Sequence, residues 1–293
     1  MDKNLKYNIN EISLDIGSLA VQAMLYEVSC FPSPGLVSPV SNGAHKDMNF
    51  YTFIDSTSSI LKYLILFTQK GYQDKSSKEI FNEIRKVGIE AEKDMFLKTN
   101  GVNTHKGMIF LIGICCGAVG KAIYDNKSSS SIQTIIKEMC EGLTENDFVN
   151  LRYKEKLSNG EKLYLKYNIK GVRGEAERGI PLVFNYALDL YENTSFLKEN
   201  DRLVHTLIGI MQFCEDSTII NRHSLDVLNY VKDISKDIME LGGMKTELGK
   251  NKIKDLCRIF IEKNISPGGS ADLLGVTVFM SLVTNYMKTI NNC

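Results

Sequence analysis

Apolar residues recur along this chain with the spacing of helices that bury one face. The first such stripe consists of Ile12, Ile16, Leu19, Ala20, Ala23 and Met24. Residues at i, i+4, i+7 and i+8 share one side of an α-helix, so this stripe predicts a helix. Similar patterns predict helices over about residues 49–70, 76–98, 104–122, 130–141, 175–192, 199–214, 223–240, 247–264 and 271–289. No strand–helix alternation or internal repeat is visible. The pattern therefore predicts an all-α fold, with residues 1–293 forming a single compact multi-helix domain.

Two segments interrupt the helical pattern. The stretch FPSPGLVSP ends the first helix, because proline lacks an N–H and biases the preceding residue away from helix. Residues 31–48 are therefore predicted to form a loop of about 18 residues, a length that is usually functional or disordered in a compact domain. Residues 142–173 are polar and irregular, and we expect a short helix or a mobile lid there.

Charge and cysteine content narrow the class of protein. The 35 basic and 35 acidic residues cancel, so the sequence predicts neither a nucleic-acid-binding stripe nor a polybasic membrane patch. The first 17 residues are too polar for a signal peptide, and we expect no apolar run to approach the roughly 18 residues of a membrane span. The seven cysteines show no CxxC spacing, which favours free thiols in the cytoplasm over disulfides or zinc.

Polar, glycine-containing clusters lie where several apolar helices are predicted to begin. They read SNGAHKDM (41–48), GVNTHKG (101–107), GVRGEAERG (171–179) and SPGGSADLL (266–274), with CEDSTIINRHS (214–224) as a fifth. The N-terminus of a helix has unpaired N–H groups and a partial positive charge, so it binds anions readily. Each cluster taken alone could equally be a capped helix start or a solvated loop.

The cluster GVNTHKG places two candidate groups at one helix start. His105 lies on the stripe of Ile109 and Ile112, so we expect it to point into the protein, whereas Lys106 lies on another line. The functional interpretation is that both side chains contact a phosphate-bearing substrate. The alternative is a satisfied core histidine beside a solvated lysine.

The clusters near the end of the chain and near residue 175 add carboxylates. Ser270 is predicted to cap a helix whose first turn contains Asp272. A phosphate bound at Gly268 and Gly269 would be repelled by Asp272 unless a cation lay between them, which predicts Mg²⁺. Glu175 and Glu177 are about 200° apart on a helix, so we expect only one of them to contact a ligand.

Together these clusters contain the groups of a Mg²⁺–nucleotide site: carboxylates for the metal and cations for the phosphates. No Walker A or GxGxxG sequence is present, which excludes a P-loop or a dinucleotide fingerprint. The predicted metal ligands are Asp47, Glu175, Glu177, Asp216 and Asp272. The predicted ligand-binding residues are Asn42, His45, Lys46, Asn103, Lys106, Arg173, Arg222, Gly268, Gly269 and Ser270.

The motifs GAHKDM, GVNTHKG, RGEAERG and PGGSADLL, in this order, resemble those of the triphosphoribosyl-dephospho-CoA synthases. The resemblance runs from about residue 19 to residue 285. It implies an all-helical enzyme that takes ATP and 3′-dephospho-CoA, displaces adenine and joins the ATP ribose to the 2′-hydroxyl of the acceptor. The product would be the prosthetic-group precursor of citrate lyase or malonate decarboxylase. The chain departs from the family pattern at Ser33, Ser38 and His223.

Such a transfer needs a base for the incoming hydroxyl and protonation of the leaving adenine. We expect Asp216 or Glu175 to act as this catalytic base, with His105 as the second choice. Three alternatives remain: a Mg²⁺-dependent nucleotide hydrolase or phosphotransferase, a side-branch ribosyl transferase with another acceptor, and a non-catalytic nucleotide-binding scaffold. The sequence also leaves open whether the protein forms a homo-oligomer.

Overall fold

The computed structural model describes residues 9–290, and these residues contain helices and no strand. The all-α prediction is confirmed. The principal helices are α1 (Glu11–Ser29), α2 (Phe50–Gly71), α3 (Ser77–Lys98), α4 (Lys106–Tyr124), α5 (Ile132–Cys140), α10 (Glu199–Met211), α12 (Leu225–Glu240), α13 (Glu247–Glu262) and α14 (Gly268–Ile290). The short helices are α6 (Leu143–Phe148), α7 (Asn159–Tyr167), α8 (Gly171–Glu177), α9 (Leu188–Asn193) and α11 (Ser217–Arg222).

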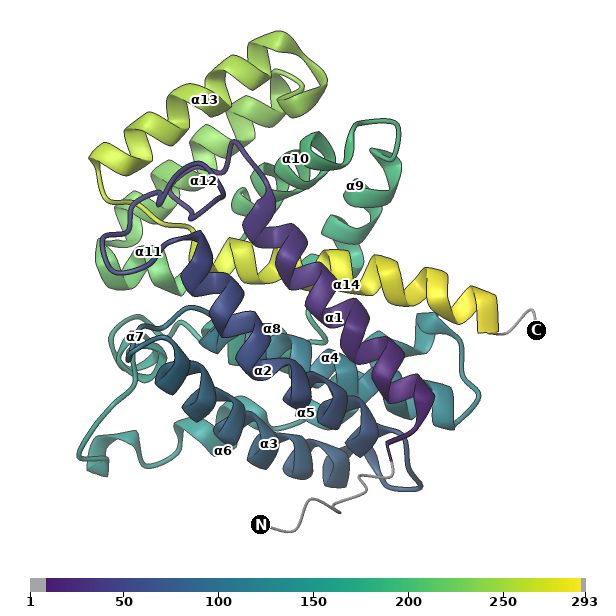
Figure 1. Cartoon of the computed structure of the whole chain (residues 1–293). Coiled ribbons are helices and arrows are strands. Elements are labelled where there is room, and N and C mark those ends of the chain that lie inside the picture. Colours follow the sequence, from purple (N-terminus) through teal and green to yellow (C-terminus); the bar gives the residue numbers. More distant parts are fainter. Residues whose placement is uncertain (1–8, 291–293) are drawn as a thin grey trace.

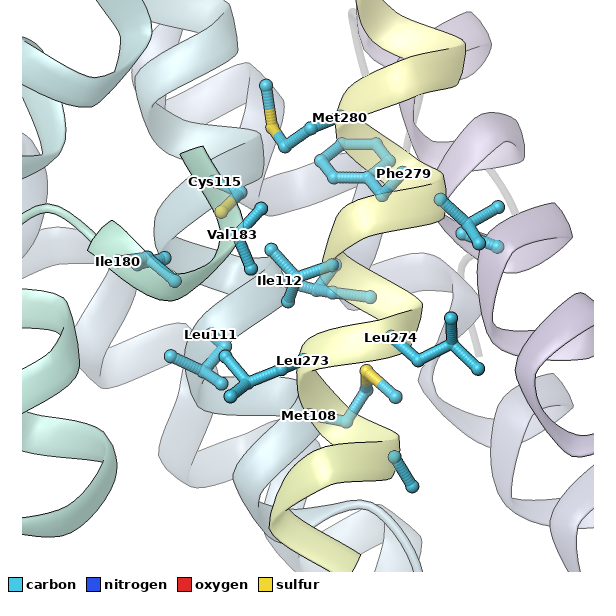
Figure 2. Close-up of a cluster of buried hydrophobic side chains, with 14 of the residues drawn as sticks. Met108, Leu111, Ile112, Cys115, Ile180, Val183, Leu273, Leu274, Phe279 and Met280 are labelled. Carbon is cyan, nitrogen blue, oxygen red and sulfur yellow. The ribbon is translucent and has the colours of Figure 1, made fainter. Parts of the chain in front are cut away.

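Helix α14 crosses the centre of the molecule, with α2 to α8 on one side and α10 to α13 on the other (Figure 1). It packs against α1, α4 and α10. Figure 2 shows the middle of this core, where Ile112 and Cys115 of α4 lie beside Leu274 and Phe279 of α14. All four side chains are fully buried.

Helix α2 packs closely against α4 because both helices carry glycine at the contact. A Cβ atom on Gly71 would lie 2.0 Å from the carbonyl oxygen of Gly117, and one on Gly120 would lie 2.4 Å from that of Thr68. Any side chain here would push the two backbones apart. Gly113, Gly117 and Gly120 recur every three or four residues along α4, a spacing that predicts close contact with another helix, and the structure confirms this contact.

Local capping explains most helix boundaries. The Asn49 and Ser76 side chains each accept the N–H three residues later and form capping boxes at the starts of α2 and α3. The loop over residues 31–48 is confirmed. It is well packed, and Leu36, Val37 and Met48 are buried. The segment over 142–173 contains α6 and α7, in line with the expected short helix.

The single helix predicted over residues 175–192 is wrong. Helix α8 ends at Glu177, and Gly179 and Ile180 both have positive φ angles, of 78° and 52°. Pro181 follows, and proline disfavours helix in the residue before it. The chain then forms a π-helical turn over Val183–Ala187 before α9 begins.

The prediction that no apolar run approaches the length of a membrane span also needs correction. Helices α4 and α14 are long and apolar enough by composition, but 72% and 61% of their most apolar stretches are buried inside the protein. Burial in a core explains the same composition, so these helices are weak evidence for a membrane span.

Candidate active site

Asp216 joins the first turns of α11 and α14. Its Oδ1 atom accepts the N–H groups of Thr218 and Ile219 at 3.0 and 3.3 Å, which caps α11. Its Oδ2 atom accepts the N–H and the hydroxyl of Ser270 at 2.8 and 3.0 Å. The carboxylate is almost fully buried, and burial raises its pKa although these hydrogen bonds oppose the shift. Two sequence clusters 54 residues apart therefore meet at one carboxylate.

Asp272 brings the start of α4 to the same place. A Cβ atom on Gly107 would lie 2.0 Å from the Asp272 Oδ2 atom, so only glycine fits beside this carboxylate. Burial, followed by the nearby charge of Asp216, raises the pKa of Asp272 well above its usual range. Helix α14 begins at Gly268, earlier than expected. The prediction of Ser270 as N-cap and of Asp272 in the first turn is therefore wrong.

Glu27, near the end of α1, is a third buried carboxylate, and the sequence interpretation missed it. Burial and the charge of Asp272 raise its pKa well above the usual range. A signal was present, because Glu27 continues the buried stripe of Ile16, Ala20 and Ala23 at i, i+4, i+7 and i+11. A glutamate on an apolar stripe is unusual unless it has a partner.

None of these three carboxylates forms an ion pair with a cationic side chain within residues 9–290. Burying an ionised carboxylate without a partner is costly. This cost favours the protonated form of each carboxyl group, and the pKa values are raised for that reason. Glu27 and Asp272 accept no hydrogen bond from a side chain or backbone group in this part of the chain, so they have free oxygen atoms for a cation.

The five predicted metal ligands do not gather around one point. Asp47 lies on the exposed side of the loop, and the Glu177 carboxylate accepts the Thr144 N–H and hydroxyl at 3.1 and 2.5 Å. Over the described range, no three histidine, cysteine, aspartate or glutamate side chains are placed to hold a metal ion together. Of these five residues, the structure brings Asp216 and Asp272 close together and turns Asp47 and Glu177 toward other surroundings.

His45 and Arg222 tie the 31–48 loop to the end of α11 and to the segment just before α14. Arg222 donates to the Ala44 carbonyl at 3.2 Å, and its second nitrogen lies 3.1 Å from His45 Nδ1. The His45 Nε2 atom lies 2.9 Å from the Ser266 hydroxyl. Burial, followed by the Arg222 charge, lowers the pKa of His45 to about 4. Lys46 and Asn42, the neighbouring predicted ligands, are exposed on this loop.

His105 points into the protein, as its position on the apolar stripe predicted. Its Nδ1 atom lies 2.7 Å from the Ser56 hydroxyl, which also accepts from Thr104. Its Nε2 atom is buried without a hydrogen-bond partner. Burial lowers the pKa of His105 to about 3, so the ring is neutral at pH 7.

The other residues of that cluster face outward. Asn103 accepts the N–H of Lys106, the first residue of α4, at 3.2 Å. The Lys106 ammonium pairs with Glu92 at 2.7 Å, and both side chains are partly exposed.

Helix α8 directs its charged residues to different partners. Arg173 and Glu177 are spaced four residues apart, which would allow an ion pair, but Arg173 binds Asp147 at 2.7 Å and Glu177 binds Thr144 instead. Glu175 faces another direction, where it accepts the Leu182 N–H at 2.8 Å and pairs with Arg178 at 3.1 Å. This divergence agrees with the expected angle of about 200° between Glu175 and Glu177.

A cavity of about 420 Å³ opens beside Glu175. Gly269 and Leu273 of α14 and Ser217 of α11 form one wall, close to Asp216. Asn185 and Tyr186 of the π-helical turn line the same cavity. A largely apolar pocket of this size with a few polar groups is typical of a ligand site, and π-helical turns are frequent at such sites.

This geometry can be set beside known proteins. Residues 13–290 match the CitG family, described as ATP:dephospho-CoA triphosphoribosyl transferase. The chain belongs to this family. It is therefore a transferase of the triphosphoribosyl-dephospho-CoA synthase class, as the four motifs predicted.

The relatives of this CitG-family chain come from several bacteria. A probable 2-(5″-triphosphoribosyl)-3′-dephosphocoenzyme-A synthase of Lactiplantibacillus plantarum is 40% identical over 273 residues, covering 92% of this chain and 96% of that protein. A protein of the same description from Malonomonas rubra is 36% identical over 96% of this chain and 91% of its own length. Protein CitXG of Leuconostoc mesenteroides is 43% identical over 89% of this chain, but over only 57% of its own length. No solved structure matches.

The residues at which this CitG-family chain departs from the expected pattern lie in the 31–48 loop and directly after α11. Ser33 and Ser38 are buried in the loop, and the Ser33 hydroxyl has no hydrogen-bond partner among the described residues. His223, directly after Arg222, lies 2.9 Å from the Asn264 carbonyl. His223 therefore links the end of α11 to the segment before α14.

Proposed function

We propose that this protein transfers the triphosphoribosyl group of ATP to the 2′-hydroxyl of 3′-dephospho-CoA and releases adenine. One observation carries the proposal. Glu27, Asp216 and the half-buried Asp272 have no cationic partner among the described residues and lie close together where α4 and α14 begin, and Gly269 and Leu273 beside them line a cavity. Helix N-termini attract phosphate, and buried carboxylates attract a divalent cation, so the two together suit a metal–nucleotide substrate.

We further propose that Mg²⁺ is held by Asp272 and Glu27. Mg²⁺ usually keeps several water ligands and binds through one or two carboxylates plus the substrate phosphates. Two free carboxylates therefore suffice, whereas a cluster of three or more is not required. When bound, the ion would neutralise part of the triphosphate charge. Asp216 is a positioning residue in this scheme, because both of its oxygen atoms already hold helix starts.

The 420 Å³ cavity is assigned to the adenine of ATP. Leu182 and Leu273 supply apolar walls, and Asn185 supplies an amide that can bond a purine edge. Glu175 is the only one of the three predicted catalytic residues that lines this cavity. We therefore assign to Glu175, ahead of Asp216 and His105, the role of the base that accepts the proton of the incoming hydroxyl. The predicted ligands Asn42, Lys46, Asn103 and Lys106 are exposed, and this proposal assigns them no contact with the substrate.

The product is proposed to serve as the prosthetic-group precursor of citrate lyase or malonate decarboxylase. The relative named CitXG supports the citrate lyase assignment. Addition of the purified product to each apo acyl carrier protein, with the matching transferase, would distinguish the two.

The direct test is adenine release. The protein is incubated with ATP, Mg²⁺ and 3′-dephospho-CoA, and the products are separated by chromatography. Adenine that appears only with the acceptor supports the proposal. ADP or phosphate in place of adenine supports the hydrolase or phosphotransferase alternative. Adenine that requires a different acceptor supports the side-branch transferase.

Helix α8 offers a matched pair of variants for the assigned base. Glu175→Gln keeps an oxygen for the Leu182 N–H but removes the charge, and we expect kcat to fall by roughly 10²-fold or more. Glu177→Gln, two residues later and bound to Thr144, should keep kcat within about twofold. Equal kcat values for the two variants would remove Glu175 from the chemical step.

A further inference from the structure

A second cavity, of about 390 Å³, lies between α3 and α4. Phe81 and Gly88 of α3 and Phe110 and Gly113 of α4 line its apolar part. It differs from the first cavity, because no lining residue is common to both. The function proposed above places only the ATP half of the reaction, so the acceptor still needs a site.

Gly88 indicates that this space is kept open. It lies in the middle of α3, where glycine is a poor helix former compared with any ordinary residue. No close packing requires it. A Cβ atom there would meet only the ring edge of Phe67, at 4.0 Å. This distance contrasts with Gly71 and Gly107, where a Cβ atom would collide at 2.0 Å. The missing side chain at Gly88 therefore keeps space open in the cavity, whereas those at Gly71 and Gly107 allow neighbouring groups to pack closely.

The rim of the second cavity is cationic. Arg85 binds both oxygen atoms of Asp147 at 2.8 and 3.1 Å, and Arg173 binds one of them at 2.7 Å. Burial opposes ionisation of Asp147, but the bonds from Arg85 and then Arg173 prevail and lower its pKa. Two guanidinium groups on one carboxylate leave one positive charge. Arginine forks of this kind bind phosphate groups well.

The two cavities adjoin neighbouring residues of α4. On α4, Leu111 lines the first cavity and Phe110 lines the second. Glu92 lines the second cavity and pairs with Lys106, one residue before the Gly107 that contacts Asp272. A ligand in each cavity would thus direct one end toward the carboxylates at the start of α4.

We propose that the second cavity binds the pantetheine arm of the acceptor, with Arg85 and Arg173 at its diphosphate. The assignment rests on the proposed function, since it takes dephospho-CoA as the acceptor. The arm is a long, uncharged chain that follows a diphosphate, and the cavity offers an apolar interior behind a cationic rim. The ribose 2′-hydroxyl, on the other side of the diphosphate, would then point toward Asp272.

The test fills the cavity at Gly88. Gly88→Leu should raise the KM for dephospho-CoA about tenfold or more and leave the KM for ATP unchanged. Gly88→Ala is the matched control, because one methyl group takes little of the space. The melting temperature of both variants should equal or exceed that of the wild type, since leucine and alanine are better helix formers.

4′-Phosphopantetheine serves as an acceptor analogue that keeps the arm and one phosphate but lacks the adenosine that it would otherwise share with ATP. Calorimetry without turnover should show that Gly88→Leu weakens the binding of both dephospho-CoA and 4′-phosphopantetheine and leaves ATP binding unchanged. Arg85→Gln should weaken both, whereas Lys86→Gln on the exposed face should weaken neither. If Gly88→Leu weakens ATP binding instead, or leaves dephospho-CoA binding unchanged, the assignment is overturned.

These binding measurements separate this proposal from the proposed function. A wild-type protein that releases no adenine would contradict the transferase chemistry. The arm assignment would still be supported if Gly88→Leu selectively weakened dephospho-CoA binding.

Discussion

The first turns of α4 and α14 differ sharply from the middles of the same two helices. In the middle, Ile112, Cys115, Leu274 and Phe279 pack with no polar group among them (Figure 2). Where α4 begins, Gly107 lies against Asp272 of α14, which has no cationic partner among the described residues. Apolar burial stabilises the fold at about 25 cal/mol per Å², whereas an unpaired buried carboxylate destabilises it. The core therefore holds in place a charged site that could not form by itself.

The largest effect on activity is expected for the carboxylate Asp272, beside the start of α4. Asp272→Asn removes a proposed Mg²⁺ ligand, so we expect adenine release to fall by roughly 10²–10³-fold. The same change removes a buried charge whose pKa is raised. Without Mg²⁺, the variant should melt at a higher temperature than the wild type at about pH 8, and this gain should disappear as the pH falls toward about 4.

The Asp272→Asn substitution keeps the shape of the side chain, so loss of activity with a gain in stability separates the charge from the packing. Calorimetric melting across the range from about pH 4 to about pH 8 measures the second half of this prediction. If the variant were less stable than the wild type at about pH 8, some favourable interaction in the metal-free protein would already offset the burial of the Asp272 charge.

Substitutions in the apolar packing should have the opposite effect, because they should lower stability and leave activity unchanged. Gly71→Ala puts a methyl group 2.0 Å from the Gly117 carbonyl oxygen. Overpacking of this kind typically costs about 1–3 kcal/mol in the free energy of unfolding. We expect denaturant melts to show that loss, while kcat of the folded fraction stays near that of the wild type. Gly88→Ala, with no atom nearer than 4.0 Å, is the control that should lose no stability.

His105, the N-cap residue of α4, should respond to pH. Burial lowers its pKa to about 3, against about 6.5 in an unfolded chain. The unfolded state therefore binds a proton first as the pH falls below about 6.5, and the folded state loses about 2 kcal/mol by about pH 5. His105→Gln should make the decline in stability over this pH range shallower. An unchanged slope in urea melts would mean that the ring is not buried in the neutral form.

The smallest effect is expected for Lys106. The sequence interpretation placed its ammonium at the substrate, but the side chain pairs with Glu92 at a partly exposed position. Exposed ion pairs of this kind contribute about 0–1 kcal/mol. Lys106→Ala should therefore change the KM for ATP by no more than about threefold. A tenfold rise in steady-state assays would return Lys106 to the phosphate site.

Local sequence was enough to define the helices and most of their ends. The apolar stripes located α2, α3 and α13, because helix periodicity and capping depend on residues only three or four positions apart. The same stripes predicted that His105 points inward, and the helical angle predicted that Glu175 and Glu177 diverge. This local reasoning failed over residues 175–192, where the effects of Gly179 and Pro181 exceeded those of the apolar pattern.

Which polar residues share a site was settled by long-range packing alone. Asp216 and Ser270 are 54 positions apart, and Glu27 and Asp272 come from opposite ends of the chain. Their proximity depends on the packing of α1, α4, α11 and α14, which no local pattern specifies. For the same reason Glu177 and Asp47, although present in promising motifs, face other partners or solvent. Residue type and spacing show which groups are available, but burial and long-range packing determine which of them can act together.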